Sequence, residues 1–359
     1  MNAEVAATPA FDFLHLPLAH GGTAGDGRIR VDPADFVVRE WLGFEADGEG
    51  DHWLLKVRKT SANTHWVVKQ LSRLSQIHPR DIGFAGLKDR NAIAEQSFTL
   101  PVRSAMESPW AGVTGDGFEV ISATRHRRKL KRGALRGNDF DIVIREFSGD
   151  TGRLAALLEV IGNHGVPNYF GPQRFGNGGG NLVRARQMFS GEIRIDDRVQ
   201  RGFALSAARA AIFNAVLARR VLNGTWSRVQ AGDLASLDGS NSIFAVEQAD
   251  DVLNERCARL DIHPSGPLWG RGSLQTQGQT LELEQQTALS LAPFGEGLER
   301  AGLDQERRSL RLRVSNLQWE QADGNVRLQF RLPRGAFATA VLHELIGSVF
   351  AGPHETEEE

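Results

Sequence analysis

An aspartate between two cations is the feature of this sequence that most directly indicates chemistry. Lys88, Asp89 and Arg90 follow a glycine-containing turn, which comes just after the short apolar stretch Ile82–Ala85. Positive charge on both sides lowers the pKa of an aspartate and keeps it ionised. An ionised carboxylate in a fixed position can act as a nucleophile or a general base. The alternative is structural, with Asp89 capping the turn or pairing with its neighbours.

A dense basic segment is the second candidate site. Residues 125–136 hold seven Lys or Arg and no acid, although the whole chain has a net charge of −2. Cations this close repel one another unless a polyanion neutralises them, and nucleic-acid phosphates do so with release of counterions. We therefore expect an RNA-binding face here, with a solvated basic loop as the alternative. The expected contacts are Arg127, Arg128, Lys129 and Lys131.

A third segment concentrates aromatic rings, amides and a guanidinium. Residues 168–176 read Asn-Tyr-Phe-Gly-Pro-Gln-Arg-Phe-Gly and lie between two predicted helices. Such groups hold unstacked RNA bases through stacking and edge hydrogen bonds. The expected RNA contacts are Tyr169, which is the only tyrosine of the chain, Gln173 and Arg174. The alternative for Tyr169 and Phe170 is a packing role under a domain junction.

A strand-rich framework must position these residues. From Arg28 to about Phe147 the pattern has period two, with β-branched and aromatic residues between Gly, Pro and Asp breaks, which is typical of strands. One helix interrupts it, because Asn63 or Thr64 can cap a stretch with apolar residues at helical spacing. The predicted strands are Asp35–Trp41, His52–Val57, Ile82–Ala85, Gln96–Val102, Glu119–Ala123 and Phe140–Ile144.

The pattern changes to a period of 3.6 between Thr151 and about Arg300 and then returns to strands. Helices are predicted near 154–161, 205–222, 250–260 and 281–291, strands at 308–314 and 326–332, and a last helix at 337–349. This order favours one α+β domain that carries an insertion. The predicted boundaries are a loosely held N-terminal arm at 1–27, a discontinuous catalytic domain at 28–154 and 306–349, an insertion at 155–305, and an acidic tail at 350–359.

Length and composition narrow the class of protein. A chain of 359 residues with 41% apolar and 24% charged residues is typical of a globular protein of two or three domains. The net charge of −2 excludes a globally basic nucleic-acid binder but not a locally basic one. The only cysteine is Cys257, and the sequence shows neither an export signal nor an apolar run long enough to span a bilayer. We therefore expect a cytoplasmic protein without disulfides or a Cys-rich zinc site.

Common catalytic motifs are absent from the sequence. It contains no Gly-x-x-x-x-Gly-Lys-Ser/Thr loop, no Gly-x-Ser-x-Gly elbow and no His-Glu-x-x-His pair. NTPases, α/β-hydrolases and zinc proteases of these types are therefore not favoured.

Five sequence blocks together resemble the TruD family of tRNA pseudouridine synthases. They are Asp-Phe-Val-Val-Arg-Glu at 35–40, Gly-Leu-Lys-Asp-Arg at 86–90 continuing to Ala92, Glu95 and Gln96, Arg-Gly-Asn-Asp-Phe at 136–140, Pro-Asn-Tyr-Phe-Gly-Pro-Gln-Arg-Phe-Gly at 167–176, and Leu-Pro-Arg-Gly-Ala-Phe-Ala-Thr-Ala-Val at 332–341. The blocks follow the family's order from about residue 28 to 347. One departure is Ala94, where the family usually has Ser or Thr.

The resemblance implies a fold and a reaction. The implied fold is an α+β pseudouridine synthase catalytic domain with a mixed, mostly antiparallel sheet, interrupted by a family-specific α/β insertion domain. The implied reaction isomerises a uridine in tRNA, typically at position 13: the C1′–N1 bond breaks, the uracil turns, and a C1′–C5 bond forms. It needs no metal or nucleotide cofactor. The implied partner is tRNA, with no membrane and no protein partner.

The resemblance also makes Asp89 the catalytic carboxylate, supported by Lys88 and Arg90, which would orient it or hold a phosphate. Which substrate atom the carboxylate attacks, or whether it removes a ribose proton, stays open. The target uridine must leave its stack, because the enzyme has to reach C1′ and both faces of the base. That step requires aromatic and amide contacts.

Four further residues are expected to contact the flipped nucleotide. Phe36, Asn138 and Phe337 match substrate-contacting positions of the family, and Phe140 shares a strand face with Asn138 because strands have period two. We assign Asn138 to the uracil edge or the ribose, and Phe140 and Phe337 to ring packing. The alternative for the strand phenylalanines is an ordinary core position.

Two other classes of function compete with this interpretation. An RNA-binding module or chaperone would keep the fold without turnover, but binding alone gains nothing from a carboxylate close to phosphates. A metal-dependent nuclease would need several carboxylates around magnesium, and beyond Asp89 the candidates are scattered acids such as Asp139 and Asp141.

Overall fold

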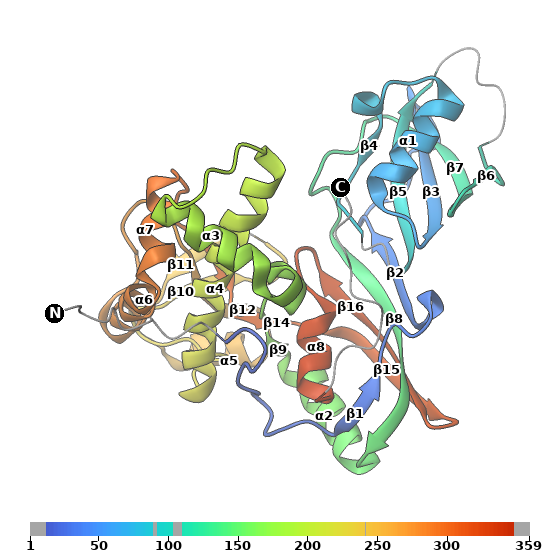
Figure 1. The fold of residues 1–359 in the computed structure, drawn as a ribbon. Coiled ribbons are helices and arrows are strands. Elements are labelled where there is room, and N and C mark those ends of the chain that lie inside the picture. The colour runs from blue at the N-terminus through green and yellow to red at the C-terminus, as the bar shows by residue number, and fades with distance from the viewer. Residues whose placement is uncertain (1–11, 89–91, 103–109, 241, 348–359) are drawn as a thin grey trace.

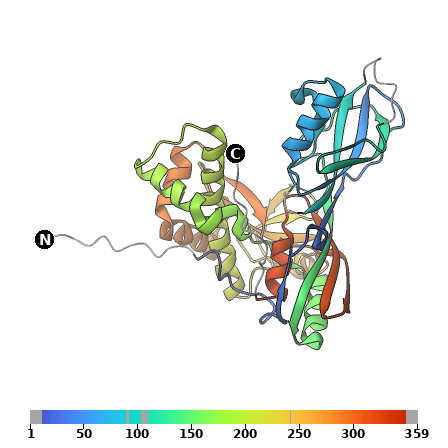
Figure 2. The same ribbon diagram turned by 45° about the vertical axis from the view of Figure 1, so that its right-hand side comes forward.

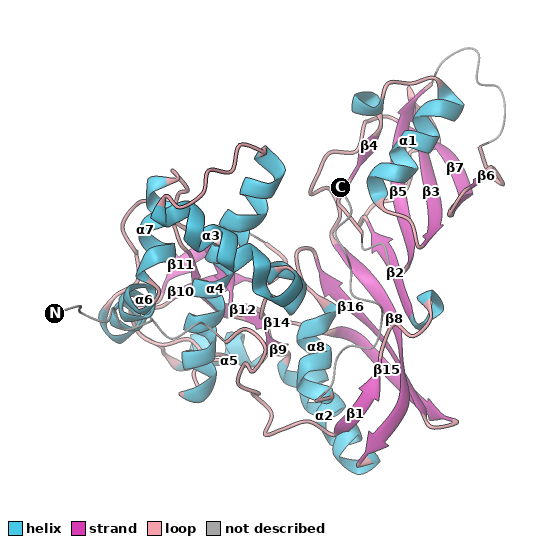
Figure 3. Cartoon of the chain, in the orientation of Figure 1, coloured by secondary structure: helices cyan, strands magenta, loops and turns pink. Residues whose placement is uncertain are grey.

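A ten-stranded sheet forms the framework of the chain in the computed structural model, which describes residues 12–88, 92–102, 110–240 and 242–347 (Figures 1 and 3). The main strand order is β15-β16-β8-β2-β5-β3-β7-β6, while β1 pairs with β8 and β4 with β5. Only the β2–β5 pair is parallel among these strands, so the expected mixed, mostly antiparallel sheet is confirmed. Its strands are β1 (Gly25–Arg28), β2 (Phe36–Trp41), β3 (His52–Thr60), β4 (Gly83–Phe84), β5 (Ile93–Pro101), β6 (Thr114–Gly115), β7 (Phe118–His126), β8 (Gly137–Gly149), β15 (Ser315–Ala322) and β16 (Asn325–Pro333).

One face of this sheet carries the hydrophobic core. Val38 of β2 lies opposite Phe140 of β8 and Ala94 of β5, and all three are buried. Helix α1 (Thr64–Ser75) packs on the part formed by β3, β5 and β7, and helices α2 (Thr151–His164) and α8 (Ala338–Leu345) pack on β8 and β16 (Figure 1). The Asn63 side chain accepts a hydrogen bond from the Trp66 amide at 2.7 Å and caps α1, as the sequence predicts.

The opposite face of the sheet carries ion pairs. Arg327 donates two hydrogen bonds of 2.8 Å to Asp141, and Arg331 donates bonds of 2.7 and 2.9 Å to Asp139. The bonds from Arg327 hold the pKa of Asp141 below its ordinary value. Both carboxylates are thus occupied by arginines, and the described residues contain no group of three or more His, Cys, Asp or Glu side chains that could hold a metal ion.

In the sequence, a helical block with its own small sheet lies between β9 (Val166–Pro167) and β14 (Arg311–Leu312), which pair with each other. Figure 1 labels these elements, and Figure 2 shows the same ribbon turned by 45°. Its four strands follow the order β11-β10-β12-β13 and are antiparallel. The predicted boundaries of the insertion, 155 and 305, stay a prediction. The elements are α3 (Gly180–Ser190), α4 (Arg198–Leu222), β10 (Leu234–Leu237), β11 (Ile243–Ala245), α5 (Asp251–Ala258), β12 (Ile262–Leu268), α6 (Gly278–Ser290), α7 (Ala292–Arg300) and β13 (Glu306–Ser309).

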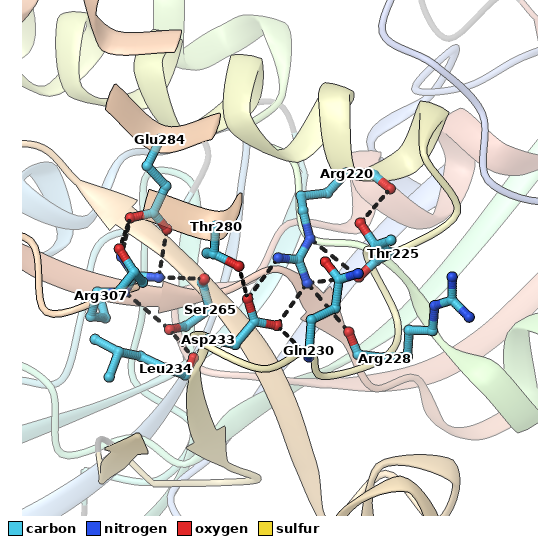
Figure 4. Close-up of polar contacts among 11 residues, drawn as sticks. Arg220, Thr225, Arg228, Gln230, Asp233, Leu234, Ser265, Thr280, Glu284 and Arg307 are labelled. Carbon is cyan, nitrogen blue, oxygen red and sulfur yellow. Dashed lines mark hydrogen bonds and ion pairs between the residues drawn. The ribbon is translucent and has the colours of Figure 1, made fainter. Parts of the chain in front are cut away.

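Two buried ion pairs hold this helical block together (Figure 4). Arg220 at the end of α4 binds both oxygens of Asp233 at 2.8 and 2.9 Å, and the Thr280 hydroxyl donates to the same carboxylate at 2.7 Å. Arg307 of β13 binds both oxygens of Glu284 on α6 at 2.8 and 2.9 Å. All four charged side chains are at most 8% exposed, so removal of either partner would leave an uncompensated buried charge.

The N-terminal segment is held more firmly than the sequence predicts. The amides of Ala19 and His20 donate hydrogen bonds of 2.9 and 3.1 Å to the buried Glu344 carboxylate, and burial raises the pKa of Glu344. The Tyr169 hydroxyl donates to the carbonyl oxygen of Pro17 at 3.3 Å. Residues 17–20 of the predicted arm are therefore bound by polar groups on α8 and after β9, while the boundary of the arm at residue 27 stays a prediction.

Several elements differ from the predicted ones. The strands β10, β11 and β12 and the helices α3 and α7 were not predicted, while the last helix ends at Leu345 and not near Val349. β12 contains Pro264, Gly266 and Pro267, residues that normally break strands. No helix within the described ranges is long and apolar enough to cross a membrane.

Replacing Asp233 with Ala should destabilise the helical block, because the buried Arg220 guanidinium would lose its counter-charge. We expect a loss of about 3–5 kcal/mol in the free energy of unfolding, measured by urea denaturation. Asp261→Ala is the matched control, since Asp261 pairs with Arg256 at an exposed site, and should cost about 1 kcal/mol or less. Equal losses for the two variants would contradict this role of Asp233.

Candidate active site

The buried side chain of Lys88 occupies the centre of the candidate site. Its Nζ lies 3.1 Å from Oε1 of Glu40 and donates a 2.7 Å hydrogen bond to Oδ1 of Asn138. Lys88 is 7% and Glu40 1% exposed at their side chains, so the pair is removed from water. Asp89, the next residue, and Arg90 lie outside the described residues, so their predicted roles stay predictions.

The turn before Asp89 is held at two backbone positions. The Thr64 hydroxyl, at the start of α1, accepts a hydrogen bond from the Lys88 amide at 3.1 Å and donates one to the Gln96 side chain at 3.0 Å. The Gln96 amide nitrogen in turn donates to the carbonyl oxygen of Gly86 at 2.6 Å. The backbone at Gly86 and Lys88 is therefore held in a fixed position relative to β5 and α1.

The alternation of the strands explains why these polar groups meet. Glu40 of β2 and Asn138 of β8 are register partners, each two residues from Val38 and Phe140 respectively, on the face that carries the core. A carboxylate at this position is next to apolar residues and needs a buried cation. Glu40, Thr64 and Gln96 were not predicted as site residues from the sequence. For Glu40 a signal was present, because it alternates with the apolar residues Phe36 and Val38 in a predicted strand.

The phenylalanines predicted to contact substrate lie in two places. Phe36 and Phe140 are 2% and 7% exposed, with ring centroids 6.2 Å apart, and the Arg30 guanidinium carbon lies 4.2 Å from the Phe36 centroid. Phe337 is partly exposed and lies 6.1 Å from Phe170, at the junction with the helical block. The structure thus places Asn138, Phe36 and Phe140 on one face, with Phe337 at its margin, and their substrate contacts stay predictions.

The aromatic segment 168–176 has mixed exposure. Tyr169 is 3% exposed and its hydroxyl binds the N-terminal segment, so the base-stacking role predicted for it does not fit the structure and the packing alternative is favoured. Burial also raises the pKa of Tyr169. Gln173 is exposed. Arg174 donates to the Ser206 hydroxyl at 2.9 Å, and its guanidinium carbon lies 5.5 Å from the Phe337 centroid.

Residues 127–136 of the basic segment connect β7 and β8, and the RNA contacts expected of this segment stay predictions. Arg127 pairs with Glu49, and the Lys129 ammonium donates to the carbonyl oxygen of Arg80 at 2.5 Å. Arg128 and Lys131 are exposed and have no hydrogen bond or ion pair to other described residues through their side chains. Of the four contacts predicted in this segment, these two cations are therefore the most available to a phosphate.

The fold matches that of a solved structure over nearly the whole chain. A solved structure from Methanosarcina mazei, described as a putative tRNA pseudouridine synthase D, superposes with a TM-score of 0.72 over 94% of this chain and 97% of the other. The two sequences are 21% identical, so this comparison shows a shared fold.

Sequence comparison then defines the family. The model of the tRNA pseudouridine synthase D (TruD) family matches residues 18–187 and 181–345. The tRNA pseudouridine synthase D of Methylococcus capsulatus is 46% identical over 94% of this chain and 95% of its own length. That of Nitrosococcus oceani is 44% identical over 92% of this chain and 93% of its own length. The chain belongs to the tRNA pseudouridine synthase D family, which confirms the resemblance seen in the sequence.

Replacing Glu40 with Gln should impair turnover more than RNA binding. The variant leaves the buried Lys88 ammonium without a counter-charge, so the turn before Asp89 should shift. A misplacement on the order of 1 Å costs about a hundredfold in rate. Single-turnover tritium release from C5-labelled uridine in tRNA measures the rate, and Glu320→Gln, at an exposed acid, is the control. A wild-type rate in Glu40→Gln would contradict the role of the pair.

The exposed cations of the basic loop should account for its RNA affinity. We expect Arg128→Ala with Lys131→Ala to weaken tRNA binding and to reduce the slope of log K against log salt by about 0.7–0.9 for each phosphate that the protein then leaves unneutralised. Adding Arg127→Ala and Lys129→Ala should change the slope less, because both side chains already have protein partners. Filter binding at several salt concentrations measures the slope, and Arg259→Ala, which removes an arginine paired with Glu255, is the control. An unchanged slope in the double variant would place the RNA elsewhere.

Proposed function

We propose that this chain converts uridine to pseudouridine in tRNA and that Asp89 is the carboxylate that carries the reaction. The first part follows from membership of the tRNA pseudouridine synthase D family, whose members are isomerases. The second part and the choice of uridine 13 as target rest on the sequence resemblance. The single cysteine, Cys257, suits a reducing compartment, and a cytoplasmic location belongs to the same proposal.

The reaction exchanges one bond of the uracil for another. The C1′–N1 bond breaks, the base turns within the site, and C1′ bonds to C5, which releases the C5 hydrogen while N1 takes up a proton. A carboxylate can assist by adding to the ribose or base and leaving again, or by removing a ribose proton. The base must be out of its helical stack throughout.

The observation that supports Asp89 is the fixation of the residue before it. Lys88 is bound at its ammonium by Glu40 and Asn138 and at its amide by Thr64. A catalytic group works best when its supporting residues hold it close to the productive geometry. Asn138 accepts a 2.7 Å hydrogen bond from the Lys88 ammonium, which supports its proposed contact with the nucleotide on which Asp89 acts.

Replacing Asp89 with Asn should abolish turnover and preserve tRNA binding. The substitution keeps the size of the side chain but removes its charge and its nucleophilic or basic oxygen, so the loss falls on transition-state stabilisation. Tritium release and filter binding are measured on the same preparation. Asp81→Asn, at a partly exposed aspartate seven residues before Lys88, is the matched control and should react at the wild-type rate.

Three outcomes are informative. Tritium release by Asp89→Asn at the wild-type rate would remove Asp89 as the catalytic residue. Loss of folding together with binding would show that Asp89 is a structural residue of the turn. Absence of tritium release by the wild-type protein on any tRNA would overturn the proposed activity itself.

A further inference from the structure

Residues 12–24 form a strap that contacts both helix α8 and the aromatic segment. In Figure 1 the strap is the dark blue trace that runs from the helical block to β1. It helps to line a cavity of about 410 Å³, to which the aromatic segment and α8 also contribute. Phe13, Leu16 and Ala19 of the strap pack against the same hydrophobic cluster as Phe337. The strap is therefore part of the packing around a predicted substrate contact.

One side of the strap is fastened to α8 by hydrogen bonds. The carboxylate of Glu344, which is fully buried, accepts bonds from the Ala19 amide at 2.9 and 3.1 Å and from the His20 amide at 3.1 Å. The Nε2 atom of His343 lies 3.0 Å from the carbonyl oxygen of Leu16. Two consecutive residues near the end of α8 thus hold the backbone of the strap.

The other side of the strap contacts the aromatic segment. The Tyr169 hydroxyl donates to the carbonyl oxygen of Pro17 at 3.3 Å. The ring centroids of Phe13 and Phe175 lie 4.8 Å apart. The strap therefore bridges α8 and the aromatic segment, which are more than 160 residues apart in the chain.

Phe337 lies where these two neighbours of the strap meet. It directly precedes α8, and its ring centroid lies 6.1 Å from that of Phe170. The residue after Phe170 approaches α8 closely, because a Cβ added to Gly171 would lie 2.4 Å from the hydroxyl oxygen of Thr339. The place of Phe337 thus depends on how α8 packs against the aromatic segment, and the strap is bound to both.

Glu344 is the charged anchor of the strap. A carboxylate removed from water is costly unless hydrogen bonds compensate it. Among the described residues these bonds come from the amides of Ala19 and His20, and no Lys or Arg forms an ion pair with Glu344. Hydrogen bonds are directional, so they restrict the position of the strap more narrowly than apolar packing alone.

We propose that Glu344 is a positioning residue: it fixes the strap against α8, and the strap sets the place of Phe337 beside the target nucleotide. The proposal rests on the proposed function, because Phe337 is taken to pack against the flipped base. A misplacement on the order of 1 Å costs about a hundredfold in rate, even when the substituted residue is far from the chemistry. Glu344 is assigned no contact with the substrate, so its effect passes through Phe337.

Replacing Glu344 with Gln should slow turnover and leave tRNA binding almost unchanged. The amide keeps one acceptor oxygen but turns a donor toward the strap amides. We expect single-turnover tritium release to fall about tenfold to a hundredfold, with the Kd from filter binding within about twofold of the wild-type value. Val246→Ala is the control for stability, because it removes buried apolar volume from a separate cluster of the helical block and should leave the rate unchanged. Thermal unfolding of both variants measures their stability.

A double-mutant cycle separates positioning from a general loss of stability. If the strap acts through Phe337, Glu344→Gln combined with Phe337→Ala should slow turnover little more than Phe337→Ala alone. Combined with Glu40→Gln, which acts through Lys88, the two losses should multiply. Multiplied losses in the pair with Phe337→Ala would overturn the proposal, as would a wild-type rate in Glu344→Gln alone.

Tyr169→Phe loosens the strap from its other side and keeps the proposal testable if Glu344→Gln does not fold. It removes only the hydroxyl that binds Pro17, so turnover should slow about twofold to fivefold, with little added loss in the Phe337→Ala background. A wild-type rate in Tyr169→Phe together with an unfolded Glu344→Gln would show that the strap is structural and would overturn the proposal.

A fluorine label reports on Phe337 without turnover. With 4-fluorophenylalanine at position 337, the fluorine NMR resonance should shift in Glu344→Gln and stay unchanged in Val246→Ala. An unchanged resonance in Glu344→Gln would overturn the link between the strap and Phe337. This measurement needs no RNA, so an inactive wild-type protein whose resonance responds to Glu344→Gln would overturn the proposed activity and keep the link.

Discussion

Burial of the Lys88 ammonium beside the Glu40 carboxylate is the interaction on which the candidate site depends. Taking two ions out of water costs several kcal/mol for each, and the cost is offset only when geometry and additional hydrogen bonds are good. Here Asn138 binds the ammonium, and the Ser97 amide donates to the second Glu40 oxygen at 2.9 Å. Strands β2, β5 and β8 must be correctly paired before these groups can meet, so the site forms only in the complete sheet.

Period-two and helical patterns predicted most elements of the large sheet, because one of its faces is buried and the alternation is regular. The predictions near β2, β3, β7 and β16 agree with the structure to within a few residues. The small sheet was missed for a physical reason. β12 lies between β10 and β13, yet it contains two prolines, which cannot donate to the ladder, and a glycine, so the local pattern indicated a break where the strand forms. β15 was missed because most of the strand is exposed and only Leu317 and Trp319 supply large apolar side chains.

The site residues that could be predicted from the sequence are those that lie in compact sequence blocks. Lys88 and Asn138 are 50 residues apart in the chain and were both singled out, and the structure joins them by a hydrogen bond. The burial of Tyr169 could not be predicted, because a buried tyrosine whose hydroxyl has a backbone partner has the same local sequence as an exposed one.

Hydrogen exchange at the Lys88 amide tests the central claim most directly, namely that a buried network fixes the turn before Asp89. The account predicts that this amide, bound to the Thr64 hydroxyl, exchanges as slowly as neighbouring amides of β5, and that Glu40→Gln accelerates it about tenfold or more while the β5 amides keep their rates. A Lys88 amide that exchanges in the wild-type protein at the rate of an unprotected one would contradict the account.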